Sequence, residues 1–143
     1  MARVLYVEDH ADTREAVARM LEISGYDVDT ASTGREALSL AIDKTPDVVL
    51  LDLALPEMNG DQVVEVLRSY HRLSLIPVVV LSAMHTGELA ERTRLLNVSS
   101  YLIKNISTFD HIHAALQSAL THRRADTRTK SPEKWRNDRI SPL

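Results

Sequence analysis

The chain has 143 residues, a mass of 16.0 kDa and a net charge of −3, with 44% apolar and 26% charged residues. This length suits one domain, and the composition excludes a disordered polyelectrolyte and a collagen-like repeat. No apolar run reaches the ~18 residues of a membrane-spanning helix, and the N-terminus lacks the apolar core of a signal peptide. The absence of cysteine excludes disulfides and thiolate zinc sites and agrees with our expectation of a cytoplasmic protein.

Strands are predicted where short apolar runs alternate with helical patterns, at Val4–Val7, Asp27–Ala31, Val48–Leu51, Val78–Leu81 and Ser100–Ile103. The first, third and fourth runs are continuously apolar and rich in β-branched residues, which is typical of strands buried on both faces. The second run alternates apolar and polar residues, and the fifth is weak. We therefore expect these two strands at the edges of a sheet.

Amphipathic stretches between the strands predict helices at Thr13–Ser24, Thr33–Asp43, Gly60–His71, Thr86–Leu96 and Thr108–His122. The first helix is expected to end at a glycine cap, Gly25. Its expected apolar face consists of Ala16, Val17, Met20 and Leu21.

Charge is distributed unevenly along the chain. Residues 1–120 hold 10 Lys and Arg against 17 Asp and Glu, whereas residues 121–143 hold 7 against 3. An acidic body is a poor nucleic-acid binder, because phosphate contacts need clustered cations. We assign one domain to residues 1–122 and a basic, poorly ordered tail or linker to residues 123–143, with no DNA-binding domain in this chain.

The regular alternation of strands and helices predicts an α/β fold. It implies parallel strands joined by right-handed crossovers. Five units in about 120 residues are too few for a closed eightfold barrel. We therefore expect a doubly wound, five-stranded parallel sheet with helices on both faces and the flavodoxin-like strand order 2-1-3-4-5.

Polar side chains follow four of the predicted strands. In a sheet of this order, ligands bind at the carboxyl ends of the strands, near the switch between strands 1 and 3. Strand 1 is followed by Glu8 and Asp9, and strand 3 by Asp52. Strand 4 ends near Ser82, and strand 5 is followed by Lys104. Three carboxylates, a hydroxyl and an ammonium are therefore predicted to meet at one edge.

Such a group of carboxylates needs a cation, because otherwise their repulsion would protonate one of them. Mg²⁺ prefers oxygen ligands and is often completed by phosphate oxygens. Around Asp52, a metal and Lys104 could neutralise phosphoryl oxygens while a carboxylate acts as nucleophile. The residues themselves thus indicate phosphoryl transfer.

Other functions lack their motifs. The glycines form neither a dinucleotide fingerprint nor a P-loop, and no Gly-x-Ser-x-Gly motif supports a serine hydrolase. A flavodoxin-like small-molecule binder would need a phosphate-cradling loop after strand 1, where residues 8–12 are acidic instead. Two hypotheses remain, a phosphorylation switch and a phosphorylation-independent protein-interaction module.

Four segments also carry a resemblance to a known family. Val7–His10, Leu50–Gly60, Val80–Ala83 and Tyr101–Lys104 resemble, in order and spacing, the receiver domains of bacterial two-component response regulators. The resemblance covers about residues 2–121, and implies a CheY-like, single-domain phosphoprotein of phosphorelay signal transduction.

The resemblance implies a role for each acidic residue. Asp52 would be the phosphoacceptor, charged from a phosphohistidine of a sensor histidine kinase or a phosphotransfer protein. Glu8, Asp9, Asp52 and the backbone carbonyl of Ala54 would bind Mg²⁺. The protein would catalyse its own phosphorylation and slow dephosphorylation with no dedicated external substrate, so whether it counts as an enzyme stays open.

The resemblance also implies how the signal is passed on. Lys104 would pair with the phosphoryl group, Ser82 would hydrogen-bond to it, and Tyr101 would rotate inward as Ser82 moves. The output surface would be formed by helix 4, strand 5 and helix 5, and would bind a downstream protein. No membrane partner is expected, and a homodimer is left open.

The sequence departs from the family pattern at two turns. The family lysine is usually followed by proline, but Asn105 follows Lys104. A cis bond before a non-proline residue costs ~2.5–4 kcal/mol, so we expect either a trans bond with a shifted loop or a strained exception. The small Gly-Ala pair that precedes strand 5 in the family is Asn97-Val98 here. Asn can adopt the left-handed conformation at a helix end, so we expect this turn to survive.

Overall fold

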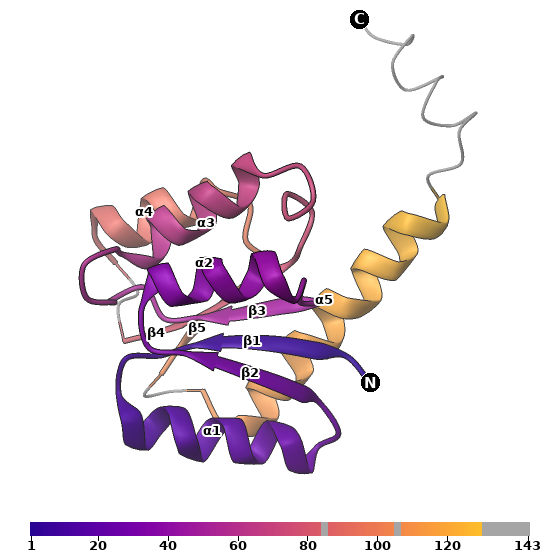
Figure 1. The fold of residues 1–143 in the computed structure, drawn as a ribbon, viewed down its shortest axis with the longest axis horizontal. Helices are drawn as coiled ribbons and strands as arrows, with labels where there is room; N and C mark the ends of the chain where they lie inside the picture. Colours follow the sequence, from indigo (N-terminus) through magenta and orange to yellow (C-terminus); the bar gives the residue numbers. More distant parts are fainter. Residues whose placement is uncertain (84–85, 105–106, 130–143) are drawn as a thin grey trace, which may run out of the picture.

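The computed structural model describes residues 1–83, 86–104 and 107–129, and it confirms the predicted alternation of strands and helices (Figure 1). The elements are β1 (Arg3–Val7), α1 (Ala11–Ile23), β2 (Asp27–Ala31), α2 (Gly34–Asp43), β3 (Val48–Leu51), α3 (Gly60–Ser69), β4 (Val78–Ser82), α4 (Glu88–Arg94), β5 (Ser100–Ile103) and α5 (Phe109–Thr129). Among the described residues, no helix has the length and apolar content needed to cross a membrane.

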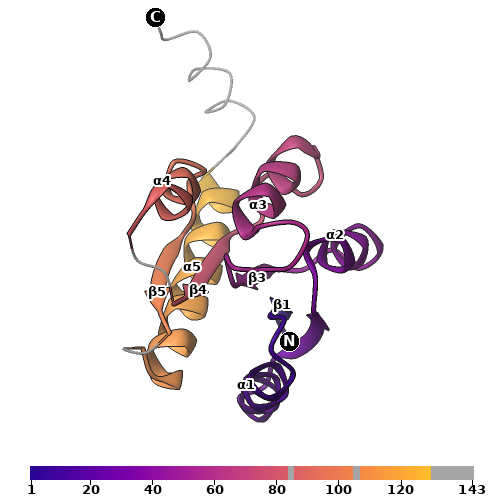
Figure 2. The same ribbon diagram turned by 90° about the vertical axis from the view of Figure 1, so that its left-hand side faces the viewer.

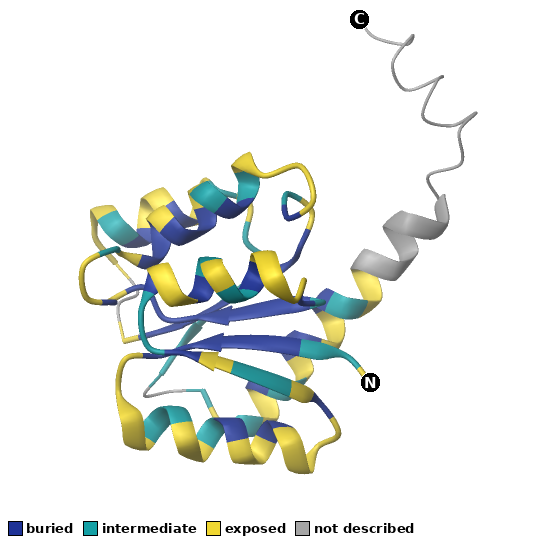
Figure 3. Cartoon of the chain, in the orientation of Figure 1, coloured by how far each residue is buried: buried dark blue, intermediate teal, exposed yellow. Residues whose placement is uncertain are grey.

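The five strands form one parallel sheet in the order β2-β1-β3-β4-β5, as predicted. Every residue of β3 and β4 is buried, as is β1 from Val4 onward, whereas β2 and β5 are partly exposed (Figure 3). This gradient follows from the sequence, because the continuously apolar strands need cover on both faces and the weaker strands do not.

Two hydrophobic cores lie on opposite faces of the sheet. Side chains alternate along each strand, so Leu5 and Val7 pack on one face while Val4 and Tyr6 pack on the other. Helices α2, α3 and α4 cover the first face, and α1 and α5 cover the second (Figures 1 and 2). The helices thus enclose the central strands and leave the carboxyl ends of the strands open at one edge.

Helix α1 ends as the sequence predicts. Gly25 adopts a φ of +99°, its N–H donates to the Glu22 carbonyl at 3.0 Å, and the Tyr26 N–H donates to the Leu21 carbonyl at 3.1 Å. This pair of bonds is a Schellman motif, which favours glycine at the left-handed position. The turn before β5 is confirmed in the same way, because Asn97 adopts a φ of +59°.

The predicted apolar face of α1 was only partly correct. Leu21 is buried and Val17 packs against the core, but Ala16 is exposed and Met20 is 43% exposed. Ala18 is buried in their place. The helix is therefore rotated from the expected orientation, because a helix that contacts both the sheet and α5 buries a face that periodicity alone places only to within a residue or two.

Helix α5 continues to Thr129, seven residues beyond the predicted end at His122. Residues 123–129 contain no glycine or proline, and Arg and Ala favour helix, so nothing in this stretch stops the helix. The extension adds about 10 Å at 1.5 Å per residue and projects past the sheet (Figure 1). The division into a domain at 1–122 and a tail at 123–143 stays a prediction, since residues 130–143 lie outside the described residues.

The start of α3 predicts a sensitive position. A Cβ atom on Gly60 would lie 2.7 Å from the backbone oxygen of Asp52 and 2.7 Å from the Cα of Leu53. We therefore expect Gly60→Ala to lower the free energy of unfolding by about 1–3 kcal/mol, the usual cost of overpacking, as measured by urea denaturation. The control is Glu65→Ala, an exposed position of the same helix. Equal unfolding midpoints for the two variants would contradict the prediction.

Candidate functional site

The register of the central strands brings two acidic residues to one edge of the sheet. Val7 of β1 pairs with Leu51 of β3, so Glu8 and Asp52 each follow a paired strand end. The Asp52 N–H donates to the Val7 carbonyl at 3.0 Å, which extends the pairing by one residue. The two carboxylates therefore lie side by side although 44 positions separate them in the chain.

The neighbouring strands add the two other groups predicted at this edge. Ser82 of β4 pairs with Ile103 of β5, and the Lys104 N–H donates to the Ser82 carbonyl at 2.9 Å. Ser82 is fully buried, whereas Lys104 is partly exposed. Parallel pairing thus places a hydroxyl and an ammonium beside the acidic strand ends.

Three carboxylates form an acidic cluster at this edge. Glu8, Asp9 and Asp52 each offer an oxygen, and these oxygens lie within 4.8 Å of one another. Glu8 and Asp52 are buried, but Asp9 is exposed, so a solute can reach the cluster from the Asp9 side. A set of carboxylate oxygens with one side open fits a hard divalent cation such as Mg²⁺, which keeps waters in its coordination shell.

Lys104 is the cation of the cluster. Its Nζ contacts a carboxylate oxygen of Glu8 and lies 3.0 Å from Oδ2 of Asp52. Burial raises the pKa of Glu8, although the hydrogen bond from Lys104 opposes this shift. Burial alone would lower the pKa of Lys104, but its hydrogen bonds to Glu8 and Asp52 outweigh that effect and raise it. Lys104 therefore stays charged, and its ammonium pairs with two of the three acids, Glu8 and Asp52.

Backbone donors fix the two buried carboxylates. The Ala54 N–H donates to Oδ1 of Asp52 at 3.1 Å, and the His10 N–H donates to Oε2 of Glu8 at 3.2 Å. With Lys104 on its other oxygen, Asp52 is held from both sides. Such preorganisation reduces the reorganisation that a reaction at this carboxylate would need.

Sequence reasoning missed Arg14. Its Nη1 donates to the backbone carbonyls of Glu8 at 2.9 Å and Asp9 at 3.3 Å, and so ties α1 to the loop that carries both acids. The sequence feature that could have indicated this role is a single cationic residue in the first turns of the helix that follows the acidic pair. The same pattern also fits an arginine that is simply exposed on a helix. Only the fold of the loop distinguishes the two.

Tyr6 is a second neighbour that the sequence did not single out as part of the site. It lies on β1, two residues before Glu8, and its side chain is buried in the core. Burial, followed by the negative charges of Glu8 and Asp52, raises the pKa of the Tyr6 phenol above its usual value. The Tyr6 phenol therefore stays neutral beside the acidic cluster.

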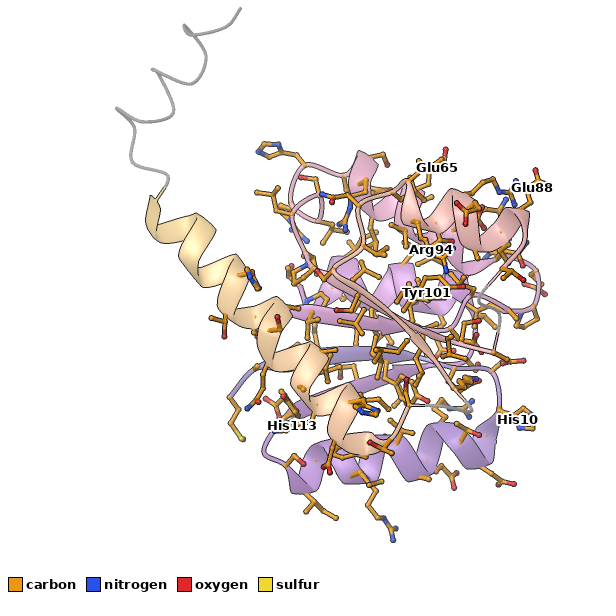
Figure 4. The ribbon with its side chains drawn as sticks, turned by 180° about the vertical axis from the view of Figure 1, so that it is seen from behind. His10, Glu65, Glu88, Arg94, Tyr101 and His113 are labelled. Atoms are coloured by element: carbon orange, nitrogen blue, oxygen red, sulfur yellow. The ribbon has the colours of Figure 1, made fainter. Side chains whose placement is uncertain are left out.

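Tyr101, the remaining predicted site residue, lies on β5 at the sheet edge. It is half-buried, and its ring packs against Arg94 of α4 (Figure 4). The structure thus gathers Glu8, Asp9, Asp52 and Lys104 into direct proximity and places Tyr101 nearby on the surface. Asn105, the departure from the family pattern, lies outside the described residues.

Comparison with known proteins gives a family. The family model for the response regulator receiver domain matches residues 4–117. Among solved structures, the chemotaxis response regulator CheY4 of Vibrio cholerae matches with a TM-score of 0.77 and 30% identity over 84% of this chain and 99% of that one. A CheY-like receiver domain protein of Methanospirillum hungatei has a TM-score of 0.81 at 19% identity, covers 88% of this chain and 98% of that one, and supports the fold alone.

Relatives found by sequence similarity are also regulatory proteins. The transcriptional regulatory protein PrrA of Mycobacterium bovis is 35% identical over 131 residues, which cover 92% of this chain and 54% of that protein. The transcriptional regulatory protein PdtaR of Mycobacterium tuberculosis is 37% identical over 113 residues, 78% of this chain and 54% of that protein. The chain therefore spans about half the length of these relatives.

The acidic cluster of Glu8, Asp9 and Asp52 is typical of the Mg²⁺ site of receiver domains and is consistent with their phosphorylation site. On the family match, the strand order and this cluster together, the chain belongs to the receiver domains of two-component response regulators.

Proposed function

We propose that this receiver domain is a phosphorylation-activated switch in which Asp52 accepts a phosphoryl group from a phosphohistidine of a sensor histidine kinase. One observation carries the proposal: a buried Asp52 carboxylate is held by the Lys104 ammonium beside two further acids, at an edge open to solvent. A merely structural ion pair would not need three carboxylates around one cation.

The transfer is a substitution at phosphorus. A carboxylate oxygen of Asp52 attacks, the new O–P bond forms as the P–N bond of the phosphohistidine breaks, and the electron pair of that bond stays on the imidazole nitrogen. Lys104 donates to a phosphoryl oxygen and offsets its charge, and the Ser82 hydroxyl donates to another. Later attack by water on phosphorus breaks the O–P bond, releases phosphate and restores the carboxylate.

Glu8, Asp9, Asp52 and the backbone carbonyl of Ala54 would hold Mg²⁺. When bound, the ion supplies positive charge that offsets the carboxylates and the phosphoryl oxygens. The donor set supports this assignment, because it consists of oxygen atoms alone and Lys104 does not neutralise all three acids.

The added phosphoryl charge would be read by the face formed by α4, β5 and α5. A new charge at Asp52 draws Lys104 and Ser82 towards the phosphoryl group, and Tyr101 responds as Ser82 moves. The phosphorylated face would then bind a downstream protein. If phosphorylation failed altogether, the alternative would be an interaction module that keeps the fold without using the site.

Removing the phosphoacceptor tests the central step. We expect Asp52→Asn to abolish Mg²⁺-dependent labelling by a small radioactive phosphodonor, because the amide cannot serve as the nucleophile. Asp43→Asn, at an exposed position that ends α2, is the matched control and should label as the unaltered protein does. Undiminished labelling of Asp52→Asn would place the phosphoacceptor elsewhere.

Mg²⁺ should stabilise the fold, because it relieves repulsion in the acidic cluster. At 100 times its Kd, a ligand that binds only the folded state adds ~2.7 kcal/mol to the free energy of unfolding. Asp9→Asn should be slightly more stable than the unaltered protein without Mg²⁺ and should gain less from it. Thermal unfolding with and without Mg²⁺ measures both effects, and an equal gain in the two proteins would exclude Asp9 as a ligand.

The stabilisation by Mg²⁺ in thermal unfolding should depend on pH. Burial raises the pKa of Glu8 above its ordinary value of 4.5. The protonation of Glu8 therefore contributes its whole stabilising effect at pH values below about 4.5. This contribution to the free energy of unfolding is lost as the pH rises through the pKa of Glu8 in the folded protein. A bound metal needs the ionised carboxylate, so the stabilisation by Mg²⁺ should grow with pH across this range. A gain that does not change with pH would contradict this role of Glu8.

Lys104 should affect phosphoryl recognition rather than metal binding. We expect Lys104→Met to retain Mg²⁺ binding, because all carboxylate ligands remain, but to bind the phosphoryl mimic beryllofluoride about 10- to 100-fold more weakly. This corresponds to loss of one charge-assisted hydrogen bond, ~1.5–3 kcal/mol. Lys44→Met, at an exposed site, is the control. Unchanged beryllofluoride affinity, measured by titration in the presence of Mg²⁺, would remove Lys104 from the mechanism.

A further inference from the structure

A cation–π contact joins α4 to β5 beside the proposed switch residue. The guanidinium carbon of Arg94 lies 4.4 Å from the centroid of the Tyr101 ring (Figure 4). Nη1 of Arg94 also pairs with Oε1 of Glu91, one turn earlier on α4, at 2.7 Å. The arginine therefore contacts both a carboxylate of its own helix and the aromatic ring on β5.

Helix α4 is held by polar contacts as well as by Leu89, which packs partly buried against the core. It has seven residues, and its buried side chains are the small residues Ala90 and Thr93. Arg92 pairs with the buried carboxylate of Asp61 on α3, at 3.3 Å. Two arginines, two positions apart, thus connect one short helix to α3 and to β5.

We propose that Arg94 is a positioning residue that holds Tyr101 against α4 in the unphosphorylated protein and so sets how readily the switch operates. The inference rests on the function proposed above and adds a residue to it. Tyr101 can leave this position only by giving up the contact with Arg94, so the contact favours the resting arrangement. A ligand that binds only when Tyr101 has left this position then binds more weakly. Its affinity falls by the factor by which the contact with Arg94 favours the resting arrangement.

The electrostatic effect of Arg94 on the Tyr101 ring supports an interaction between the two side chains. Burial raises the pKa of the Tyr101 phenol, and the positive charge of Arg94 opposes that increase. Removing the arginine should therefore raise this pKa further, which gives a readout that reports the contact itself. A partly exposed cation–π contact corresponds to a factor of about two to five in an equilibrium constant.

The test uses the full chain, Mg²⁺ and beryllofluoride, with the ring signals of Tyr101 followed by NMR and assigned with Tyr101→Phe. We expect Arg94→Met to bind beryllofluoride about two- to fivefold more tightly at unchanged Mg²⁺ affinity. In the absence of ligand, its Tyr101 signal should move towards the beryllofluoride-bound position.

Arg92→Met is the matched control, because it removes an α4 arginine of the same helix that contacts Asp61 instead of Tyr101. Its beryllofluoride affinity should equal that of the unaltered protein. Equal tightening in both variants would mean that α4 has merely loosened, which overturns the specific role of Arg94. In a Tyr101→Leu background, Arg94→Met should have no further effect, and a persistent effect would also overturn it.

The two proposals fail in different ways. If the unaltered protein does not bind beryllofluoride with Mg²⁺, the phosphorylation switch is wrong and the role of Arg94 falls with it. If the unaltered protein binds but Arg94→Met leaves the affinity and the Tyr101 signal unchanged, only the role of Arg94 is wrong.

Discussion

The site depends on an unequal charge balance: the carboxylates of Glu8, Asp9 and Asp52 lie together, and the ammonium of Lys104 pairs with two of them, Glu8 and Asp52. Carboxylates this close repel one another, and burial adds a desolvation cost, most clearly at the fully buried Glu8. The lysine offsets only part of this cost. The remaining negative charge suits a divalent cation, and the rest of the fold must offset the destabilising effect of the cluster.

The central strands supply that stability. Residues Val48–Leu51 and Val78–Ser82 are buried along their whole length, and both faces of the sheet pack against helices. Because parallel strands end at the same edge, a core built from apolar strands also fixes the positions of whatever residues follow them. The acids at the ends of β1 and β3 are thus positioned by the hydrophobic packing beneath them, while Lys104 and the backbone donors orient their carboxylates.

The difference between apolar packing and polar side-chain contacts explains how far the sequence could predict the structure. Strand order and the meeting of Glu8, Asp52 and Lys104 were predictable, because they follow from apolar runs and from which residue comes next. The exposed position of Met20 and the length of α5 were not, because helix rotation and helix ends depend on tertiary contacts and on the absence of a stop signal. Long side chains were the least predictable: Arg14 acts on backbone carbonyls five and six positions away, which no periodicity encodes.

The distribution of burial also bears on where a change of state can occur. Strand β5 is half-buried throughout, and α4 is short and fully buries only Ala90 and Thr93, whereas β3, β4 and β1 from Val4 onward are buried. Local rearrangement costs least where few apolar contacts are lost. A charge added at Asp52 would therefore act between well-buried central strands and a less buried α4–β5 border. We therefore expect a single contact at this border, such as that between Arg94 and Tyr101, to affect the balance between two arrangements more than one contact within the core would.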